Sequence, residues 1–375
     1  MRWSISVCIV TINEGDAWSV ARDVRVQAAI DNWYPRFVAN GVDINDFQRI
    51  TADLESWDQW CAAWSCWGAM HEALGRESEE AGWLRSAGEH YRHASMLYHF
   101  GKFMFFHAPE EHRAAHERTI ALYERALPYF DPPAERVEIP YEGGHVIPGI
   151  LRKPAHVIKP PLVILIPGLD SVKEELHAYG EDFLARGMAV LAIDGPGQGE
   201  LEFDLPMRFD YEVPLGHVLD YLAGRRDLDS RRVGAMGVSF GGYYALRSAS
   251  HDTRLSAVIA LATGYRFVDY FDRVPILTRE ALIKRLHAVD EDDARGKLER
   301  FDLHGLMDRL RAPALVVMGR KDRLFPAEAA EEMVADSDGK ATLVMYDDGN
   351  HVCNNIPYKY RPMQADWMSQ HLCVG

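Results

Sequence analysis

The sequence predicts an α/β protein in which an N-terminal all-helical domain precedes a mostly parallel, doubly wound sheet. Two observations support this prediction. Residues 1–132 show helical periodicity with few Val or Ile runs, whereas residues 133–375 alternate short apolar strands with helices. The proline-bearing segment DPPAE at 131–135 separates the two patterns. We therefore expect a helical domain over 1–132 and a sheet-containing domain over 133–375.

The composition is that of an ordinary globular protein, with 47% hydrophobic and 26% charged residues in a chain of 375. The net charge of −15 and the lack of a long Lys/Arg run argue against nucleic acid as a partner. Five cysteines at irregular spacings indicate a reducing compartment rather than a disulfide framework. Cys61 and Cys66 lack a second pair that would complete a metal site, so we interpret them as core residues.

The N-terminus carries a short apolar run, Ser4–Ile12, that faintly resembles a signal peptide. Glu14, Gly15 and Asp16 follow it where small residues would form a cleavage site, which argues against secretion. No stretch reaches the roughly 18 consecutive apolar residues of a membrane-spanning helix. We expect a cytoplasmic protein with no membrane partner.

The helical domain contains a tryptophan series, Trp57, Trp60, Trp64 and Trp67, that recurs at helical spacing on one face of one helix. This face either packs against other helices or roofs a pocket for a flat, apolar substrate. The segment also holds His112 and His116, one helical turn apart. That pair lacks the glutamate of HExxH and a third ligand, so we interpret both histidines as surface residues and expect no metal.

The second domain begins with RVEIPYEGGHVIPGILRKP, which predicts two strands joined at Gly143–Gly144. Further strands are expected at 162–166, 188–193, 233–236, 255–261, 314–318 and 341–346, and helices at 177–186, 213–223, 241–250, 327–334 and 364–372. Short apolar strands with intervening helices are typical of a parallel sheet covered on both faces. Residues 264–311 form a helical insertion longer than one crossover needs, and we expect part of a lid there.

The motif GVSFGG at 237–242 follows the strand VGAM and precedes the helix YYALRSAS. Strand, tight Gly-x-Ser-x-Gly turn and helix form the nucleophile elbow of serine hydrolases, in which small neighbours let the backbones pass closely. Ser239 is therefore the candidate nucleophile. A serine hydroxyl needs a base within hydrogen-bond reach, and the base needs an orienting carboxylate.

Asp322 and His351 are the candidate carboxylate and base. Each follows a strand, in the loops GRKDRLFP and DDGNHVCNN, and the chain order Ser, Asp, His is the one expected after a nucleophile elbow. Open parallel sheets place their sites at such strand ends. Three rival acids fit less well: Asp347 and Asp348 lie too close to the histidine along the chain, and Asp229 precedes the nucleophile strand.

The oxyanion hole should combine the backbone N–H of Phe240, just after the nucleophile, with an N–H from the loop after an earlier strand. The strand LVILIPGLD ends at Pro167-Gly168, so Leu169 is the expected second donor. The Gly-rich segment DGPGQGE at 194–200 lacks the Lys-Ser/Thr of a phosphate-binding loop. We interpret it as a turn that keeps the site entrance open.

The chain resembles a branch of the α/β-hydrolase superfamily. PGLDSVKEELHAYGEDFLARGMAVLAIDGPGQGE, GVSFGG and GNHVCNN are similar to the group that contains 2,6-dihydroxypseudooxynicotine hydrolase of bacterial nicotine breakdown and the fungal yellowish-green hydrolases that shorten polyketide precursors. The similarity extends into the helical half, through DVRVQAAIDNWYPRFVANGVDINDFQRI and YHFGKFMFF. It implies an α/β-hydrolase fold with a helical N-terminal cap, a homodimer, and the triad Ser239, Asp322 and His351.

The resemblance also implies hydrolysis of a carbon–carbon bond next to a ketone, in 1,3-diketone-like substrates. Members that cleave such bonds use an added acidic side chain downstream of the nucleophile. An ungapped count places Tyr270 at that position, with Asp269 beside it, so the substrate-side chemistry departs from that of the nicotine-degrading member. The many aromatic residues of the helical half favour an aromatic or polyketide-like small molecule, and no cofactor is expected.

Three functions stay open at this point. The first is a serine hydrolase that cleaves a carbon–carbon bond through an acyl-enzyme on Ser239. The second applies the same three residues to a carboxylic ester, lactone or thioester. The third is a non-catalytic binding protein with the hydrolase fold, in which the three residues do not assemble.

Overall fold

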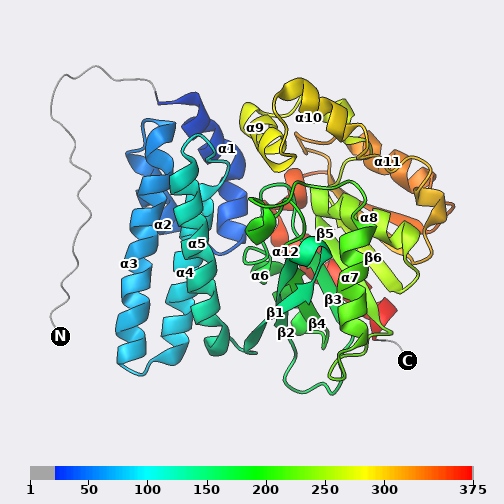
Figure 1. Cartoon of the computed structure of the whole chain (residues 1–375), viewed down its shortest axis with the longest axis horizontal. Helices are drawn as coiled ribbons and strands as arrows, with labels where there is room; N and C mark the ends of the chain where they lie inside the picture. Colours follow the sequence, from blue (N-terminus) through cyan, green and yellow to red (C-terminus); the bar gives the residue numbers. More distant parts are fainter. Residues whose placement is uncertain (1–21, 374–375) are drawn as a thin grey trace.

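The computed structural model describes residues 22–373. The weak signal-peptide resemblance at Ser4–Ile12 lies outside the described residues. Five helices come first, followed by a sheet-containing region (Figure 1). The helices are α1 (Val24–Ala39), α2 (Ile44–Ala52), α3 (Trp60–Glu80), α4 (Leu84–Lys102) and α5 (Pro109–Ala126), with short 3₁₀ turns at Trp57–Gln59 and Leu127–Tyr129.

The sheet has eight strands in the order β1-β2-β4-β3-β5-β6-β7-β8. The strands are β1 (Ala134–Pro140), β2 (Val146–Arg152), β3 (Leu162–Ile166), β4 (Ala189–Ile193), β5 (Val233–Val238), β6 (Leu255–Leu261), β7 (Ala314–Gly319) and β8 (Ala341–Tyr346). β1 pairs antiparallel with β2, and β2 antiparallel with β4, while all later pairings are parallel. The predicted hairpin at Gly143–Gly144 and the mostly parallel sheet are confirmed.

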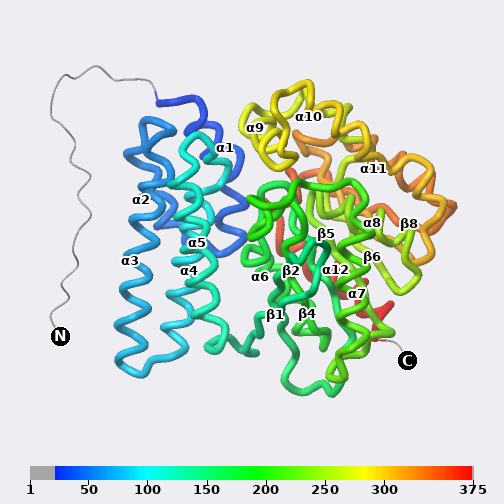
Figure 2. Tube along the Cα trace, in the orientation of Figure 1, coloured from blue at the N-terminus to red at the C-terminus, as the bar shows by residue number. Residues whose placement is uncertain are grey.

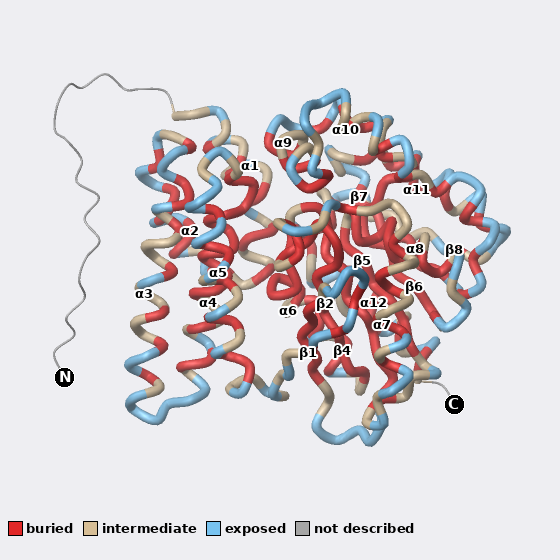
Figure 3. Tube along the Cα trace, in the orientation of Figure 1, coloured by how far each residue is buried: buried red, intermediate tan, exposed pale blue. Residues whose placement is uncertain are grey.

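The helices that cover the sheet are α6 (His177–Leu184), α7 (Glu212–Ala223), α8 (Phe240–His251), α11 (Ala327–Ala335) and α12 (Pro357–Leu372). α8 packs on β5 and β6 beside α7, whereas α12 packs on β5 and β6 beside α6. Every residue of β3, β4 and β7 is buried, which explains their continuous apolar sequences. The buried sheet lies at the centre of this region (Figure 3). α12 begins seven residues before the predicted helix at 364, because Pro357 is tolerated in a first helical turn.

The segment between β6 and β7 contains the 3₁₀ turn Phe267–Tyr270, α9 (Ile276–Arg285), α10 (Glu291–Leu298) and a second 3₁₀ turn at Met307–Arg309. α9 and α10 form the yellow upper edge of the trace in Figure 2. The helical character predicted for residues 264–311 is therefore present. Glu280 of α9 forms an ion pair with Arg25 of α1 at 2.8 Å, which links this segment to the helical region.

The tryptophan series packs in the core of the helical region, with Trp67 partly buried against it. Trp57, Trp60 and Trp64 are at most 2% exposed, and the series stacks through Trp57–Trp60 and Trp60–Trp64 contacts. Trp57 lies in the turn before α3 rather than on that helix. None of the four lines the cavity at Ser239, where the helical region instead contributes Trp33. The helix-packing interpretation holds, and the pocket-roof alternative is wrong for these four residues.

A buried ion-pair network joins the helical region to the sheet region. The carboxylate of Glu175, in the segment between β3 and α6, accepts hydrogen bonds from Arg36 at 2.6 and 2.7 Å and from Asn40 at 2.6 Å. His99 of α4 lies 2.9 Å from the same carboxylate. Although burial opposes the charge, Arg36 and His99 hold the pKa of Glu175 below its ordinary value. Over residues 22–373, none of the helices has the length and apolar character needed to cross a membrane.

Candidate active site

Ser239 sits at a strained turn between β5 and α8. Its backbone has φ 57° and ψ −118°, a left-handed conformation that non-glycine residues rarely adopt. The flanking glycines explain how the turn fits: a Cβ at Gly237 would lie 1.8 Å from the carbonyl oxygen of Gly241, and one at Gly241 would lie 2.2 Å from that of Ile166. Larger residues are therefore excluded at both positions, as the nucleophile elbow requires.

The structure brings Ser239, His351 and Asp322 into one hydrogen-bonded chain. His351 Nε2 lies 3.1 Å from Ser239 Oγ, and His351 Nδ1 lies 2.7 Å from Asp322 Oδ2. The Asp322 side chain is fully buried, and its Oδ1 accepts the backbone N–H groups of Leu324 and Phe325. These two bonds fix the carboxylate, so its second oxygen stays directed at the imidazole.

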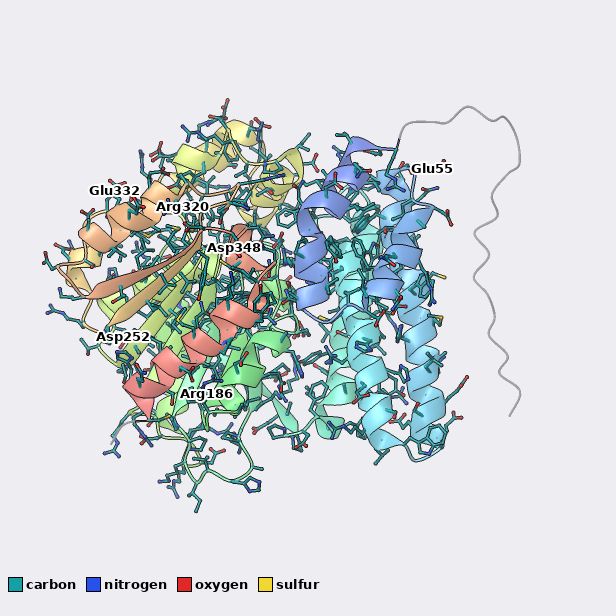
Figure 4. The ribbon with its side chains drawn as sticks, turned by 180° about the vertical axis from the view of Figure 1, so that it is seen from behind. Glu55, Arg186, Asp252, Arg320, Glu332 and Asp348 are labelled. Carbon is teal, nitrogen blue, oxygen red and sulfur yellow. The ribbon has the colours of Figure 1, made fainter. Side chains whose placement is uncertain are left out.

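The three rival acids are engaged elsewhere. Asp348 binds Lys359 at 2.6 Å and Asp347 binds Arg320 at 2.9 Å. Figure 4 labels Asp348 and Arg320 on the side opposite to that of Figure 1. Asp229 accepts from Arg232 at 2.8 Å. Among the described residues, Asp322 is the carboxylate within hydrogen-bond reach of the His351 ring.

Within the described residues, the backbone N–H groups of Leu169 and Phe240 donate no hydrogen bond to another group. The neighbouring N–H of Gly168, in contrast, donates to Ser171 Oγ at 2.9 Å. A Cβ on Gly168 would lie 3.2 Å from Ser239 Cβ, which shows how closely this loop approaches the nucleophile. Leu169 and Phe240 therefore have the free donors that an oxyanion hole needs.

Gln198 is a residue of this site that sequence reasoning missed. Its side-chain amide donates to the carbonyl oxygens of Pro167 at 2.6 Å and Gly168 at 3.2 Å. Its Oε1 accepts from the N–H of Gly195 and from the Tyr211 hydroxyl. The segment 194–200 is thus packed beneath the Leu169 loop, with Gln198 fully buried. Our interpretation of it as a turn that opens the entrance is wrong.

A cavity lies over Ser239 and His351. It is lined largely by apolar and aromatic side chains from both regions: Trp33, Met104, Leu169, Phe240, Phe267 and Phe325. Tyr270 and Phe271 from the insertion also line it. The insertion and the helical region therefore both contribute walls to the space in which a substrate would meet the nucleophile.

Tyr270 and Asp269, the two residues expected to contact the substrate, differ in position. Tyr270 lines the cavity, and its hydroxyl oxygen accepts the backbone N–H of Tyr265 at 3.3 Å, which leaves its O–H free to donate. Burial raises the pKa of Tyr270 above its ordinary value. Asp269 does not line the cavity: its side chain is 53% exposed and pairs with Arg266. The expectation that Asp269 contacts substrate is wrong, because the 3₁₀ turn directs neighbouring side chains to different sides.

Charged groups occupy the part of the cavity wall where α1 meets the segment between β3 and α6. Arg36 binds Asp170 at 2.8 Å as well as Glu175, and all three residues line the cavity. Asp170 directly follows Leu169 in sequence, so an unpaired carboxylate there would repel a developing oxyanion. The guanidinium of Arg36 compensates that charge. Arg36 carried no recognisable signal in the sequence, because a lone arginine in an amphipathic helix is usually exposed.

The histidine pair of α5 is buried, which the sequence did not predict. His112 and His116 are each only 3% exposed, so the interpretation of both as surface residues is wrong. They face the segment after β4, where His112 Nε2 lies 2.6 Å from a carboxylate oxygen of Glu202. Helical periodicity alone does not show that a second region covers this face.

Three carboxylates, from Glu174, Asp194 and Glu200, lie close enough together to suggest a metal centre. The ammonium group of Lys173 occupies the space among them, at 2.6, 3.0 and 2.5 Å respectively. A buried lysine that binds all three carboxylates supplies the positive charge that a cation would bring. The cluster is therefore a structural ion-pair network.

The fold and the site geometry are those of an α/β-hydrolase. A family model described as "Esterase FrsA-like" matches residues 56–373, and the chain belongs to this family. It is 30% identical over 362 residues to 2,6-dihydropseudooxynicotine hydrolase of Paenarthrobacter nicotinovorans, with 95% of this chain and 96% of that protein covered. The resemblance to the group that contains this relative is confirmed.

Two further comparisons agree. The crystal structure of the 2,6-dihydroxy-pseudo-oxynicotine hydrolase superposes with a TM-score of 0.84 at 29% identity, and covers 90% of this chain and 95% of that one. The α/β hydrolase gkaG of Penicillium citrinum is 36% identical over 238 residues, which is 60% of this chain and 56% of that protein. The similarity to the first relative thus includes the N-terminal helical region as well as the sheet region.

Proposed function

We propose that the protein is a serine hydrolase that cleaves a carbon–carbon bond next to a ketone, in an aromatic or polyketide-like 1,3-diketone. The observation that supports it most is the hydrogen-bonded chain Ser239–His351–Asp322 beneath an aromatic cavity that Tyr270 helps to line. The relationship over nearly the full chain to a protein named as the hydrolase of a pseudooxynicotine adds to it. In this proposal the helical region acts as a cap over the site.

The first half-reaction forms an acyl-enzyme. His351 Nε2 takes the proton of Ser239 Oγ, and the oxygen attacks one carbonyl carbon of the diketone. The N–H groups of Leu169 and Phe240 donate to the oxyanion of the tetrahedral intermediate. When that intermediate collapses, the bond between the carbonyl carbon and the adjacent carbon breaks. The electron pair passes to the neighbouring ketone as an enolate, because that ketone delocalises the charge.

Protonation of the enolate then releases the leaving group as a ketone. Tyr270 lines the cavity, and we assign its hydroxyl to hydrogen-bond the enolate oxygen, while the imidazolium of His351 returns the proton taken from Ser239. A water molecule deprotonated by His351 attacks the acyl-serine, which releases a carboxylic acid and restores the hydroxyl. Each turnover consumes one water and yields one carboxylic acid and one ketone.

The alternative is a carboxylic ester, lactone or thioester hydrolase with the same three residues. Two observations favour it: the matching family is described as esterase-like, and the acidic side chain nearest the expected position, Asp269, points away from the cavity. An ester leaving group departs as an alkoxide and needs no stabilisation of an enolate. Tyr270 would then line the cavity and take no part in the reaction.

The experiment that separates these functions uses pairs of aryl 1,3-diketones and aryl esters with the same acyl group, with products identified by mass spectrometry. Carbon–carbon hydrolysis predicts that each diketone yields a carboxylic acid and a methyl or aryl ketone, and that Ser239→Ala abolishes both. Turnover of the esters alone would assign the alternative. If neither class is turned over and Ser239 does not react with a fluorophosphonate, the protein is a binding protein with this fold.

A further inference from the structure

Asp170 places a carboxylate with an unused oxygen in the wall of the cavity over Ser239. The residue lines that cavity, and its side chain is 12% exposed. One of its oxygens, Oδ1, accepts a hydrogen bond from Arg36 at 2.8 Å. The other, Oδ2, has no hydrogen-bond partner within residues 22–373, and it is not among the unpartnered polar atoms that burial closes off from solvent. It is therefore an acceptor that a molecule in the cavity can reach.

The second carboxylate of the cavity wall, Glu175, offers no such oxygen. Each of its two oxygens already has two partners, which come from Arg36, Asn40 and His99. Among the described residues that line the cavity, Glu175 and Asp170 are the carboxylates. Asp269, the acid expected from the resemblance, lies outside the cavity. Asp170 is thus the acidic residue of the described cavity wall that has an oxygen left for a substrate.

The position of Asp170 in the chain relates this acceptor to the reacting carbonyl. Asp170 directly follows Leu169, whose N–H is the donor that we assign to the oxyanion. Because consecutive Cα atoms are about 3.8 Å apart, a carbonyl bound by that N–H lies near the Asp170 carboxylate. An ionised carboxylate accepts hydrogen bonds and donates none. The substrate group beside the reacting carbonyl must therefore be a donor, since an ether or carbonyl oxygen placed there would be repelled.

The charges around Asp170 strengthen the acceptor and disfavour an anionic substrate group. Arg36 binds both Asp170 and Glu175, so one cation faces two carboxylates. Although burial opposes its charge, Arg36 and His99 hold the pKa of Glu175 below its ordinary value, which keeps that carboxylate ionised. Hydrogen bonds to an ionised acceptor are about twice as strong as those between neutral groups. A donor from the substrate would also reduce the repulsion between Asp170 and the oxyanion.

We propose that Asp170 selects substrates in which a phenolic hydroxyl lies ortho to the reacting carbonyl, by accepting the hydrogen of that hydroxyl at Oδ2. The aromatic walls of the cavity suit the aryl ring, and the ortho position keeps the hydroxyl next to the carbonyl that the Leu169 N–H binds. The proposal rests on the proposed function in one respect, namely that Ser239 attacks an aryl carbonyl. It holds for a diketone and for an ester, because both present the same acyl group.

The test is calorimetric titration of the full-length Ser239→Ala protein, which cannot form an acyl-enzyme. The two ligands are 1-(2-hydroxyphenyl)-3-phenylpropane-1,3-dione and its 2-methoxyphenyl analogue, which lacks the donor. Asp170→Asn in the same background is the probe. Its amide oxygen can still accept from Arg36, so the NH₂ group takes the place of Oδ2 and turns an acceptor into a donor. Asp269→Asn is the matched control, since it makes the same change in net charge outside the cavity.

We expect the Ser239→Ala protein and its Asp269→Asn form to bind the hydroxyl ligand about tenfold more tightly than the methoxy ligand. Asp170→Asn should remove that preference and bind the methoxy ligand at least as tightly as before, which shows that the cavity is intact. A preference retained in Asp170→Asn, an equal loss for both ligands, or no binding of either would overturn the proposal. Turnover by the wild type reports on the proposed function separately: preferential binding of the hydroxyl ligand without its cleavage would contradict that function and leave the role of Asp170 standing.

Discussion

Gln198 holds the carbonyl oxygen of Gly168 at 3.2 Å through its side-chain amide. The N–H of Leu169 belongs to the same peptide unit, and in a planar trans peptide the N–H points away from the C=O. The hydrogen bond from Gln198 therefore directs the Leu169 N–H away from Gln198, in a loop where a Cβ on Gly168 would lie 3.2 Å from Ser239 Cβ. Gln198 is thus a positioning residue for the donor that we assign to the oxyanion hole.

Gln198→Met should lower kcat with little change in KM. The methionine has a similar length but cannot donate to the two carbonyls, so the Leu169 N–H loses its fixed direction. Loss of one oxyanion donor costs about 10²–10³ in rate, and we expect a decrease of about 10–10² because the donor is loosened rather than removed. Affinity for a trifluoromethyl ketone, which forms a tetrahedral adduct, should fall by the same factor as kcat. A change in KM alone would contradict the positioning role.

Ser239→Ala should lower activity by about 10⁶, and His351→Ala should cost about as much. The double variant should be no worse than either single one, because the two residues act as a unit. Steady-state rates with the best substrate of the diketone and ester panel measure this. Additive losses would mean that the serine and the histidine work independently, contrary to their 3.1 Å contact.

Tyr270→Phe should separate the two candidate reactions. If Tyr270 hydrogen-bonds the enolate, the variant loses about 10²-fold in kcat on a diketone but retains ester hydrolysis, in which no enolate forms. Asp269→Asn is the control, since its side chain is exposed and lies outside the cavity. Equal losses on both substrate classes would leave Tyr270 with only a structural role.

Glu175→Gln should destabilise the protein by about 3 kcal/mol or more, because it leaves Arg36 buried without its principal counter-charge. Glu138→Gln is the comparison: that carboxylate is 61% exposed and lies 3.5 Å from Arg136, so its loss should fall within about 0.5 kcal/mol. Urea unfolding at pH 7 measures both. If both substitutions changed the free energy of unfolding by similarly small amounts, the ion-pair network between the regions would contribute nothing to stability.

Glu200 predicts a pH dependence of stability. Burial opposes its charge, but Arg136 and Lys173 lower its pKa from 4.5 to about 2. A lowered carboxyl pKa stabilises the fold above the unfolded value, and that stabilisation is lost as the pH falls through the folded value. Glu200→Gln should therefore cost about 3 kcal/mol at pH 7 and less than half of that at pH 3. A constant difference between the two pH values would contradict the lowered pKa.

The sheet and the candidate catalytic residues were predictable because their signals are local. Continuous apolar strands and the glycines around Ser239 are fixed by backbone sterics within a few residues. The loops of Asp322 and His351 follow from strand order, since parallel strands present their carboxyl ends at one edge. These are properties that a single sequence expresses directly.

The remaining features depend on contacts between distant segments. Gln198 acts on Gly168, thirty residues away, and Arg36 acts on Glu175, so neither role is visible in its own neighbourhood. The sequence predicts an exposed His112 because its partner, Glu202, lies in another region of the chain. Asp269 and Tyr270 are adjacent in sequence, and only the geometry of the 3₁₀ turn decides which one faces the cavity.

The most direct measurement of the central claim is rapid-quench peptide mass spectrometry of the protein mixed with an aryl 1,3-diketone in a single turnover. The account predicts that the peptide containing Ser239 gains the mass of the aryl acyl group before the carboxylic acid appears, and that the ketone is released in the same phase as acylation. Formation of both products from the diketone without an acyl adduct on Ser239 would contradict it.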